Sequence, residues 1–183
     1  SGALAMNHMP ATGTSGVDLY AIDSDGKWKI LTDRYNFGDT VTFTYSNIIE
    51  NNYHNRGYEY RLFLPLYNSV TWMEIGVPES AEFSFIPLLK EKPIVVYGTS
   101  IVQGACASRP GMAWTNILSR KLDYPVINLA YSGNGPLEKV KVDMINELDA
   151  SLIIYDCLPN MINLTDDEVK KRTAYGVSAI REK

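Results

Sequence analysis

The stretch PIVVYGTS, residues 93–100, decides the fold of this 183-residue chain. Its consecutive apolar residues 94–97 are typical of a strand buried on both faces of a parallel sheet. Two more apolar runs, residues 125–129 and 152–155, follow downstream with amphipathic segments between them. This alternation of strand and helix predicts a parallel three-layer α/β unit with right-handed crossovers.

The segments around these strands have helical spacing. We expect helices over residues 112–122 and 137–148, and a third helix that begins with a capping box at residues 165–168. The apolar residues expected to face inward on these helices are Trp114, Ile117, Leu118 and Leu122, then Leu137, Val140, Met144, Ile145 and Leu148, and finally Val169, Val177 and Ile180.

The first half of the chain has a different pattern. Apolar and polar residues alternate over residues 40–45 and 58–66, which predicts half-buried strands, and another strand is expected over residues 70–75. Asp25-Gly26 favours a tight hairpin turn, and residues 47–57 form a polar loop. We therefore predict two domains: residues 1–90 as a β-sandwich-like accessory domain and residues 91–183 as a partial α/β domain.

Composition excludes several classes of partner. A net charge of −4 argues against nucleic acid and anionic membranes, and no apolar run approaches the ~20 residues of a membrane span. Two cysteines and two histidines cannot build a Cys/His metal cluster, and we expect no cofactor. No signal peptide is visible, which leaves the compartment open, with a secreted or periplasmic location favoured.

Chemistry is expected where the parallel strands end, because ligands of open sheets bind beyond the carboxyl ends of the strands. The three loops there are residues 98–104, 131–135 and 156–160, and all are rich in small, hydroxyl and amide residues. Ser100 could be a nucleophile for acyl transfer or a cap of the next turn. Its surroundings match neither a Walker A loop nor the nucleophile elbow of α/β-hydrolases.

Two further residues could stabilise the negative charge of an acyl-transfer transition state. Gly133 would let a backbone N–H approach a ligand closely, and Asn160 would offer a neutral side-chain N–H. The alternatives are a turn glycine and a polar cap before the next helix. With Ser100 in a third loop at the same edge, the functional interpretation is the better one.

Four motifs in order give the chain a family resemblance. Residues 98–101 (GTSI), 128–135 (NLAYSGNG) and 156–160 (DCLPN) resemble the first three blocks of SGNH (GDSL-like) hydrolases. Residues 16–20 (GVDLY) match the Gly-x-Asp-Leu-Tyr motif of the subfamily with an upstream β domain. The resemblance spans residues 9–161 and implies a flavodoxin-like fold with strand order 2-1-3-4-5.

The same resemblance implies a serine esterase or acylhydrolase that acts on a small ester or an O-acylated carbohydrate. Ser100 would be the nucleophile, and its own N–H, the Gly133 N–H and the Asn160 side chain would form the oxyanion hole. The chain departs from the family in one mild respect, because Thr99 replaces the aspartate of the name motif.

The severe departure is the missing base. The family takes its histidine from a C-terminal Asp-x-x-His motif, whereas this chain has only His8 and His54, both upstream of Ser100. Asp156 is a poor base for a hydroxyl. We therefore expect a fragment of a longer enzyme, weak or inactive alone, with an open edge at its third parallel strand. A homo-oligomer could cover that edge.

Other interpretations stay open. Cys106 and Cys157 could be packed thiols, which we favour, or a disulfide. A carbohydrate-binding or accessory module without catalysis is the main rival function, and a nucleotide-binding α/β domain is a weaker one. The aromatic residues that could line a sugar surface, although we expect most of them in the core, are Tyr20, Trp28, Tyr45, Tyr60 and Trp72.

Overall fold

The computed structural model describes residues 3–31, 34–38, 40–46 and 59–181. Its contacts divide the chain into two compact units. The first, called the β unit below, comprises Ser1–Leu89 together with Cys106–Met112. The second, called the α/β unit, comprises Lys90–Ala105 and Ala113–Lys183. A short piece of the second half of the sequence thus belongs structurally to the first unit.

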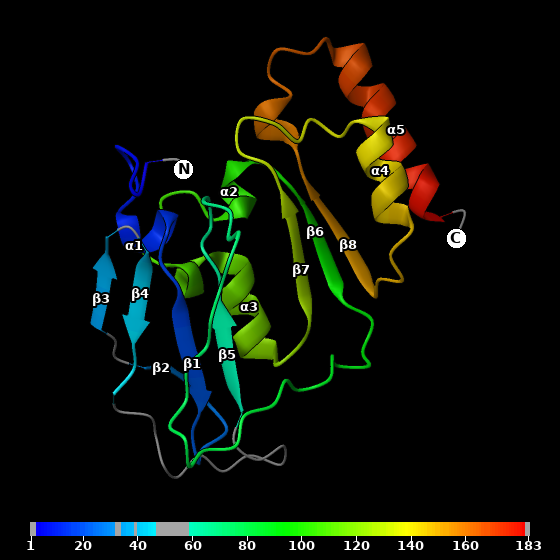
Figure 1. Cartoon of the computed structure of the whole chain (residues 1–183). Helices are drawn as coiled ribbons and strands as arrows, with labels where there is room; N and C mark the ends of the chain where they lie inside the picture. The colour runs from blue at the N-terminus through cyan, green and yellow to red at the C-terminus, as the bar shows by residue number, and fades with distance from the viewer. Residues whose placement is uncertain (1–2, 32–33, 39, 47–58, 182–183) are drawn as a thin grey trace. The chain divides into compact units, whose positions relative to one another are not determined.

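A three-stranded parallel sheet organises the α/β unit (Figure 1). Its strands are β6 (Ile94–Gly98), β7 (Val126–Ala130) and β8 (Leu152–Asp156), in the order β7-β6-β8. The register pairs the last residues of all three strands with one another, so their carboxyl ends lie at one edge. The predicted parallel α/β architecture is confirmed.

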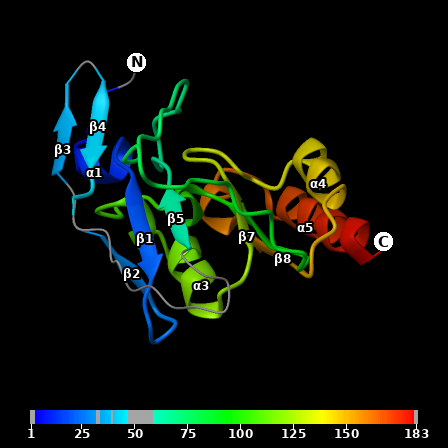
Figure 2. The same cartoon turned by 60° about the horizontal axis from the view of Figure 1, so that its bottom comes forward.

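Helices cover both faces of this sheet (Figure 2). The short helix α2 (Ser100–Gln103) and α3 (Trp114–Leu122) lie on one face. Helices α4 (Lys139–Asn146) and α5 (Asp166–Arg181) lie on the other. The chain therefore builds three layers, as the strand and helix alternation predicts.

The main apolar core lies between the sheet and the α4 and α5 side. Buried Val95 and Tyr97 of β6 pack there with Val142 and Ile145 of α4 and with Met161. Alternate residues of a strand point to opposite faces, which is why these two strand residues share this core.

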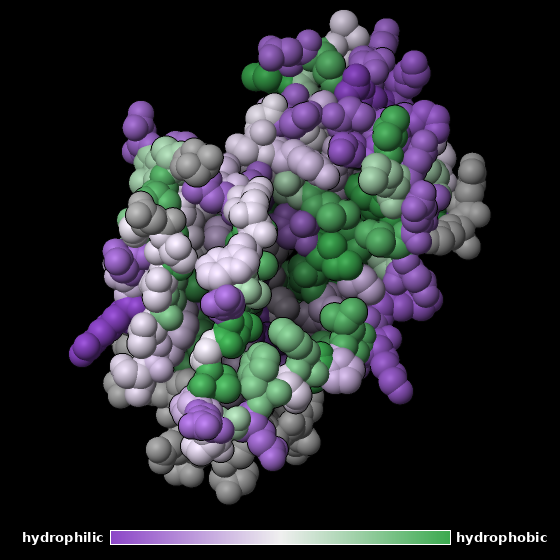
Figure 3. Space-filling view, in the orientation of Figure 1, coloured by the Kyte–Doolittle hydropathy of each residue, from purple (hydrophilic) through white to green (hydrophobic). Residues whose placement is uncertain are grey.

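The predicted inward faces of the helices are partly wrong. Val140 and Met144 of α4 are 67% and 57% exposed, and Trp114 and Leu122 of α3 and Val177 of α5 are exposed as well. Figure 3 shows apolar side chains at the surface over β8 and α4. Half of the predicted capping box of α5 is observed, since the Glu168 N–H donates to Thr165 Oγ1 at 3.3 Å, while the Glu168 carboxylate accepts from Arg172 Nε at 2.8 Å.

The β unit is antiparallel. The tight turn at Asp25-Gly26 is confirmed, because Gly26 takes a φ of +73° and the Asp23 N–H donates to the Lys27 carbonyl at 3.0 Å. The unit contains α1 (Ala11–Thr14), a sheet of order β2-β1-β5 made of Trp28–Ile30, Asp18–Ile22 and Tyr60–Phe63, and a separate pair, β3 (Arg34–Phe37) with β4 (Val41–Thr44).

Other expectations for this half fare differently. The strand expected over residues 70–75 is wrong, because this segment has no strand pairing and its Trp72 is 62% exposed. The polar loop expected over residues 47–57 lies outside the described residues. A β-sandwich stays a prediction.

Three observations apply to residues 3–31, 34–38, 40–46 and 59–181. In this part of the chain, no helix combines the length and the apolar character that a bilayer crossing requires. These residues also hold no group of three or more His, Cys, Asp and Glu side chains able to bind a metal ion. Among them, no strand pairs with the outer edge of β8. Self-association through that edge stays a prediction.

Candidate active site

Ser100 lies where the central strand β6 ends and α2 begins. Its side chain is half-buried, while the preceding Thr99 is fully buried. A Cβ on Gly98 would come within 2.5 Å of the Asp156 carbonyl oxygen and 2.7 Å of Val102 Cγ2. Only a glycine at position 98, two residues before Ser100, therefore allows β8 and α2 to approach the end of β6 this closely.

The second loop packs directly against the residues that precede Ser100. Gly135 has a φ of +83°, and a Cβ there would overlap the Gly98 carbonyl and lie 3.7 Å from the Thr99 nitrogen. The Tyr131 N–H also donates to the Gly98 carbonyl at 3.0 Å. Gly135 had no predicted role, although it is the last residue of the family-like block 128–135.

The third loop is tied to the second through Asn160. This residue ends a short 3₁₀ helix, Leu158–Asn160, and its Nδ2 donates to the Asn134 carbonyl. It does not cap α5, whose first turn is capped by Thr165. A carboxamide has two N–H groups, and this bond uses one of them.

Gly133 differs from Gly135 in its surroundings. It is exposed, its φ is +69°, and a Cβ on it would meet no atom within 4 Å. Its left-handed backbone favours glycine, but no neighbour requires one. The second loop thus contains one glycine packed against the chain at Gly98 and one that borders open space.

Two side chains that the sequence did not single out support α2. The Asn128 Nδ2 donates to the Val102 carbonyl at 2.7 Å and to Thr115 Oγ1 at 3.0 Å, which joins β7 to α2 and α3. The Gln103 Oε1 accepts the Ser132 N–H at 2.7 Å. Helix α2, which starts with Ser100, is therefore fastened from the adjacent strand and from the second loop.

The cysteines are free thiols, so the disulfide alternative is wrong. Cys157 is buried at the end of β8, and its Sγ lies 3.8 Å from the Tyr97 carbonyl oxygen. Burial, with a smaller contribution from the Asp156 carboxylate, raises the pKa of Cys157 to about 12. The thiolate is the nucleophilic form of cysteine, so Cys157 is not a nucleophile at neutral pH.

No histidine belongs to the α/β unit. His8 is an exposed residue of the β unit, and His54 lies outside the described residues. Asp156 ends β8 and pairs with Gly98, the last residue of β6. The sequence of the α/β unit therefore supplies a serine hydroxyl and amide N–H groups at this edge, but no imidazole.

Two family models match the chain. The GDSL-like lipase/acylhydrolase family matches residues 91–183, and the N-terminus of SGNH-hydrolase-type esterases, GxDLY, matches residues 1–83. A solved structure of a protein from Bacteroides ovatus, assigned as a GDSL-like lipase, is 36% identical with a TM-score of 0.76. The match covers 97% of this chain and 50% of that one, so the chain spans half the length of this relative. No curated protein matches the chain.

Proposed function

Because the chain belongs to the GDSL-like lipase/acylhydrolase family, we propose that it carries the nucleophile and the oxyanion donors of a serine esterase. The observation that carries the proposal is the close approach of the second and third loops to Gly98, two residues before Ser100. Gly135 packs on Gly98, Asn160 holds the second loop through Asn134, and Asp156 pairs with Gly98. The proposed substrate is a small ester or an O-acylated carbohydrate.

In the proposed reaction, Ser100 Oγ attacks the ester carbonyl and forms a tetrahedral intermediate. Its collapse expels the alcohol and leaves an acyl group on Ser100, which water then hydrolyses to the free acid. The Ser100 N–H, the Gly133 N–H and the second Asn160 Nδ2 hydrogen stabilise the oxyanion. One such donor is typically responsible for about 10²–10³ in rate.

The proton of Ser100 needs an acceptor, and a base with a pKa near the working pH does this best. The family resemblance places that base in an Asp-x-x-His motif, which this sequence does not contain. We therefore propose that these 183 residues alone hydrolyse esters weakly or not at all. Removing triad members from serine proteases leaves roughly 10³–10⁴ over water.

The test adds the missing base from solution. Hydrolysis of p-nitrophenyl acetate is measured with increasing imidazole, for the chain and for its Ser100→Ala variant, whose rate gives the background from imidazole itself. We expect an imidazole-dependent rate that exceeds the Ser100→Ala rate, and a Ser100 acyl adduct in mass spectrometry. Identical rates for the two proteins would refute the nucleophile assignment. High Ser100-dependent turnover without imidazole would refute the claim of a missing base.

A further inference from the structure

Residues 106–112 join α2 to α3 in the sequence but make their contacts in the β unit. The chain thus passes from one unit to the other at Leu89–Lys90, Ala105–Cys106 and Met112–Ala113. This segment, called the 106–112 segment below, starts directly after the turn that contains Ser100. Contacts that order this segment therefore restrict the backbone that directly follows that turn.

Asp18, the acidic residue of the Gly-x-Asp-Leu-Tyr motif, makes two polar contacts with the segment. Its Oδ1 forms an ion pair with Arg109 Nε at 2.8 Å, and its Oδ2 accepts the Gly111 N–H at 2.7 Å. The Asp18 side chain is 1% exposed, whereas that of Arg109 is 29% exposed. A carboxylate this deeply buried is stable only with such partners, so the contact is a specific one.

Tyr20 of the same motif packs on the same segment. A Cβ on Gly111 would lie 2.7 Å from the Tyr20 hydroxyl oxygen and 2.8 Å from its ring carbon Cζ, so only glycine fits against the ring. Asp18 and Tyr20 are two residues apart on β1 and therefore face the same side of the strand. The two-residue spacing in the motif therefore directs a carboxylate and an aromatic ring toward the same 106–112 segment.

Two residues just before the motif also contact the 106–112 segment. Thr12 Oγ1 donates to the Ser108 carbonyl at 2.6 Å. A Cβ on Gly13 would overlap the Ala107 carbonyl oxygen and lie 3.3 Å from the Ser108 carbonyl carbon. The segment is thus held along most of its length by residues 12–20.

We propose that the Gly-x-Asp-Leu-Tyr motif is a clasp for the 106–112 segment, and that Asp18 is a positioning residue for α2. The N–H groups of Gly104 and Ala105 donate to the Ser100 carbonyl at 3.1 and 2.9 Å, and Cys106 follows immediately. Because Cys106 is covalently joined to Ala105, order in the segment restricts the backbone freedom at the end of this turn. The consequence for catalysis rests on the proposed function, because it takes Ser100 as the nucleophile.

The experiment compares Asp18→Asn with Asp23→Asn in the full chain. The carboxamide in Asp18→Asn keeps an oxygen for the Gly111 N–H but loses the charge that pairs with Arg109. Asp23, which follows β1, also pairs with a cation, Lys29, and its other hydrogen bonds are to residues 25–27 of the hairpin turn, so its variant is the matched control. The readouts are amide hydrogen exchange over residues 100–105 and kcat and KM of the imidazole-assisted reaction.

We expect Asp18→Asn to speed exchange over residues 100–105 at least 10-fold. We also expect it to lower the Ser100-dependent kcat by about 10- to 100-fold, since a displacement near 1 Å can cost about 10² in rate. KM and amide exchange in β6 should change little. A general loss of structure would change both. Asp23→Asn should alter neither readout.

A double variant covers the case in which Asp18→Asn does not fold. Asp18→Asn with Arg109→Gln removes both charges and leaves neither one buried without a partner. Its exchange over residues 100–105 should also rise. Unchanged exchange in a folded variant would overturn the clasp. If exchange rises while no Ser100-dependent reaction is seen even in the parent chain, the proposed function fails and the clasp stands.

Discussion

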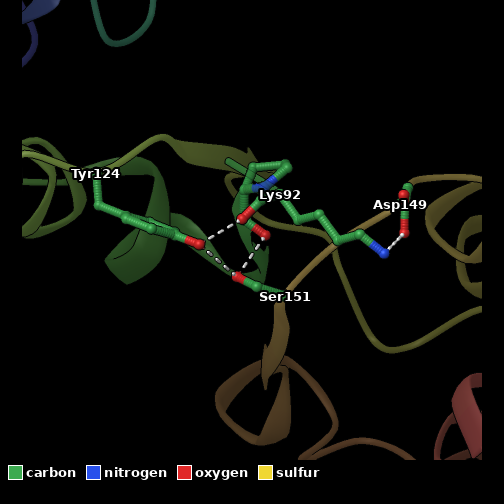
Figure 4. A network of polar contacts seen from close by, with 5 residues as sticks. Lys92, Tyr124, Asp149 and Ser151 are labelled. Atoms are coloured by element: carbon green, nitrogen blue, oxygen red, sulfur yellow. Dashed lines mark hydrogen bonds and ion pairs between the residues drawn. The ribbon is translucent and has the colours of Figure 1, made fainter. Parts of the chain in front are cut away.

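The two ends of the parallel sheet hold polar groups in different ways. At the amino end, shown in Figure 4, the Tyr124 hydroxyl donates to the Lys92 carbonyl at 2.9 Å and lies 3.4 Å from Ser151 Oγ. Ser151 Oγ donates to the Pro93 carbonyl at 3.2 Å, and Lys92 pairs with Asp149 at 2.9 Å. These residues immediately precede the strands, and their contacts fasten one strand's start to the next.

At the carboxyl end the close contacts come mainly from backbone, together with one side-chain amide. Gly98 lies against the Asp156 carbonyl, Gly135 lies against Gly98, and the amide of Asn160 bridges to the second loop. Polar content alone does not distinguish the two ends of the sheet, since both have hydroxyl groups and charged side chains. The difference is that glycines let neighbouring chain segments approach one another closely at the carboxyl end, where the proposed site lies.

The largest effect is expected for Gly135→Ala, which tests the close packing at the carboxyl end of the sheet. The new Cβ overlaps the Gly98 carbonyl, and the backbone φ of +83° is strained for alanine. We expect the free energy of unfolding to fall by about 3 kcal/mol and the Ser100-dependent reaction to be lost. Thermal denaturation and the imidazole-assisted assay measure the two effects.

The matched control is Gly133→Ala, where the strain of a positive φ is similar but no atom lies within 4 Å of the new Cβ. It should cost about 1 kcal/mol of stability and keep the sheet intact. If both variants lost the same free energy of unfolding, the close packing at Gly135 would contribute nothing specific to the carboxyl end of the sheet.

The next largest effect is expected for Asn128→Asp. The substitution removes the N–H groups that bond the Val102 carbonyl and Thr115 Oγ1, while keeping the oxygen that accepts the Ala130 N–H at 3.1 Å. Groups left without partners in a part-buried place cost about 1–3 kcal/mol. The Ser100-dependent rate should fall because α2 loses its tie to β7. A destabilised variant with a full rate would separate Asn128 from the position of Ser100.

The strands and their common edge could be predicted from sequence because each is a short apolar run followed by small and polar residues. The faces of α4 could not. Val140 with Met144 and Val142 with Ile145 form two overlapping stripes, and which one faces the sheet depends on how the chain enters the helix. Leu137, buried with a φ of +56°, precedes that entry, and residue spacing does not predict such a conformation.

The candidate site was predictable only where a motif named a chemical group. Ser100, Gly133 and Asn160 stand out as a hydroxyl, a glycine and an amide at strand ends. Gly135 and Asn128 matter because of contacts with Gly98 and Val102, which lie far away in the sequence. Both residues belong to the block 128–135, but their contacts arise from tertiary packing, so the block alone does not show what each of them does.

A smaller effect is expected at the amino end for Tyr124→Phe. Only the hydroxyl is lost, and with it the bonds to the Lys92 carbonyl and Ser151. Solvent can replace part of this bonding, so we expect a loss of about 0.5–1 kcal/mol in unfolding free energy. The Ser100-dependent rate should equal that of the parent chain. A rate reduced as much as in Asn128→Asp would mean that both ends of the sheet support the site alike.

The smallest effect is expected for Asp149→Asn. The Lys92–Asp149 pair has side chains that are 61% and 73% exposed, and exposed ion pairs contribute little because water and salt screen them. We expect unfolding free energies within about 0.5 kcal/mol of the parent chain, with the difference vanishing at about 1 M salt. Denaturation at low and high salt measures this. A larger loss that survives high salt would show that the pair holds the start of β8 through more than its charges, and the amino end would then be as specifically built as the carboxyl end.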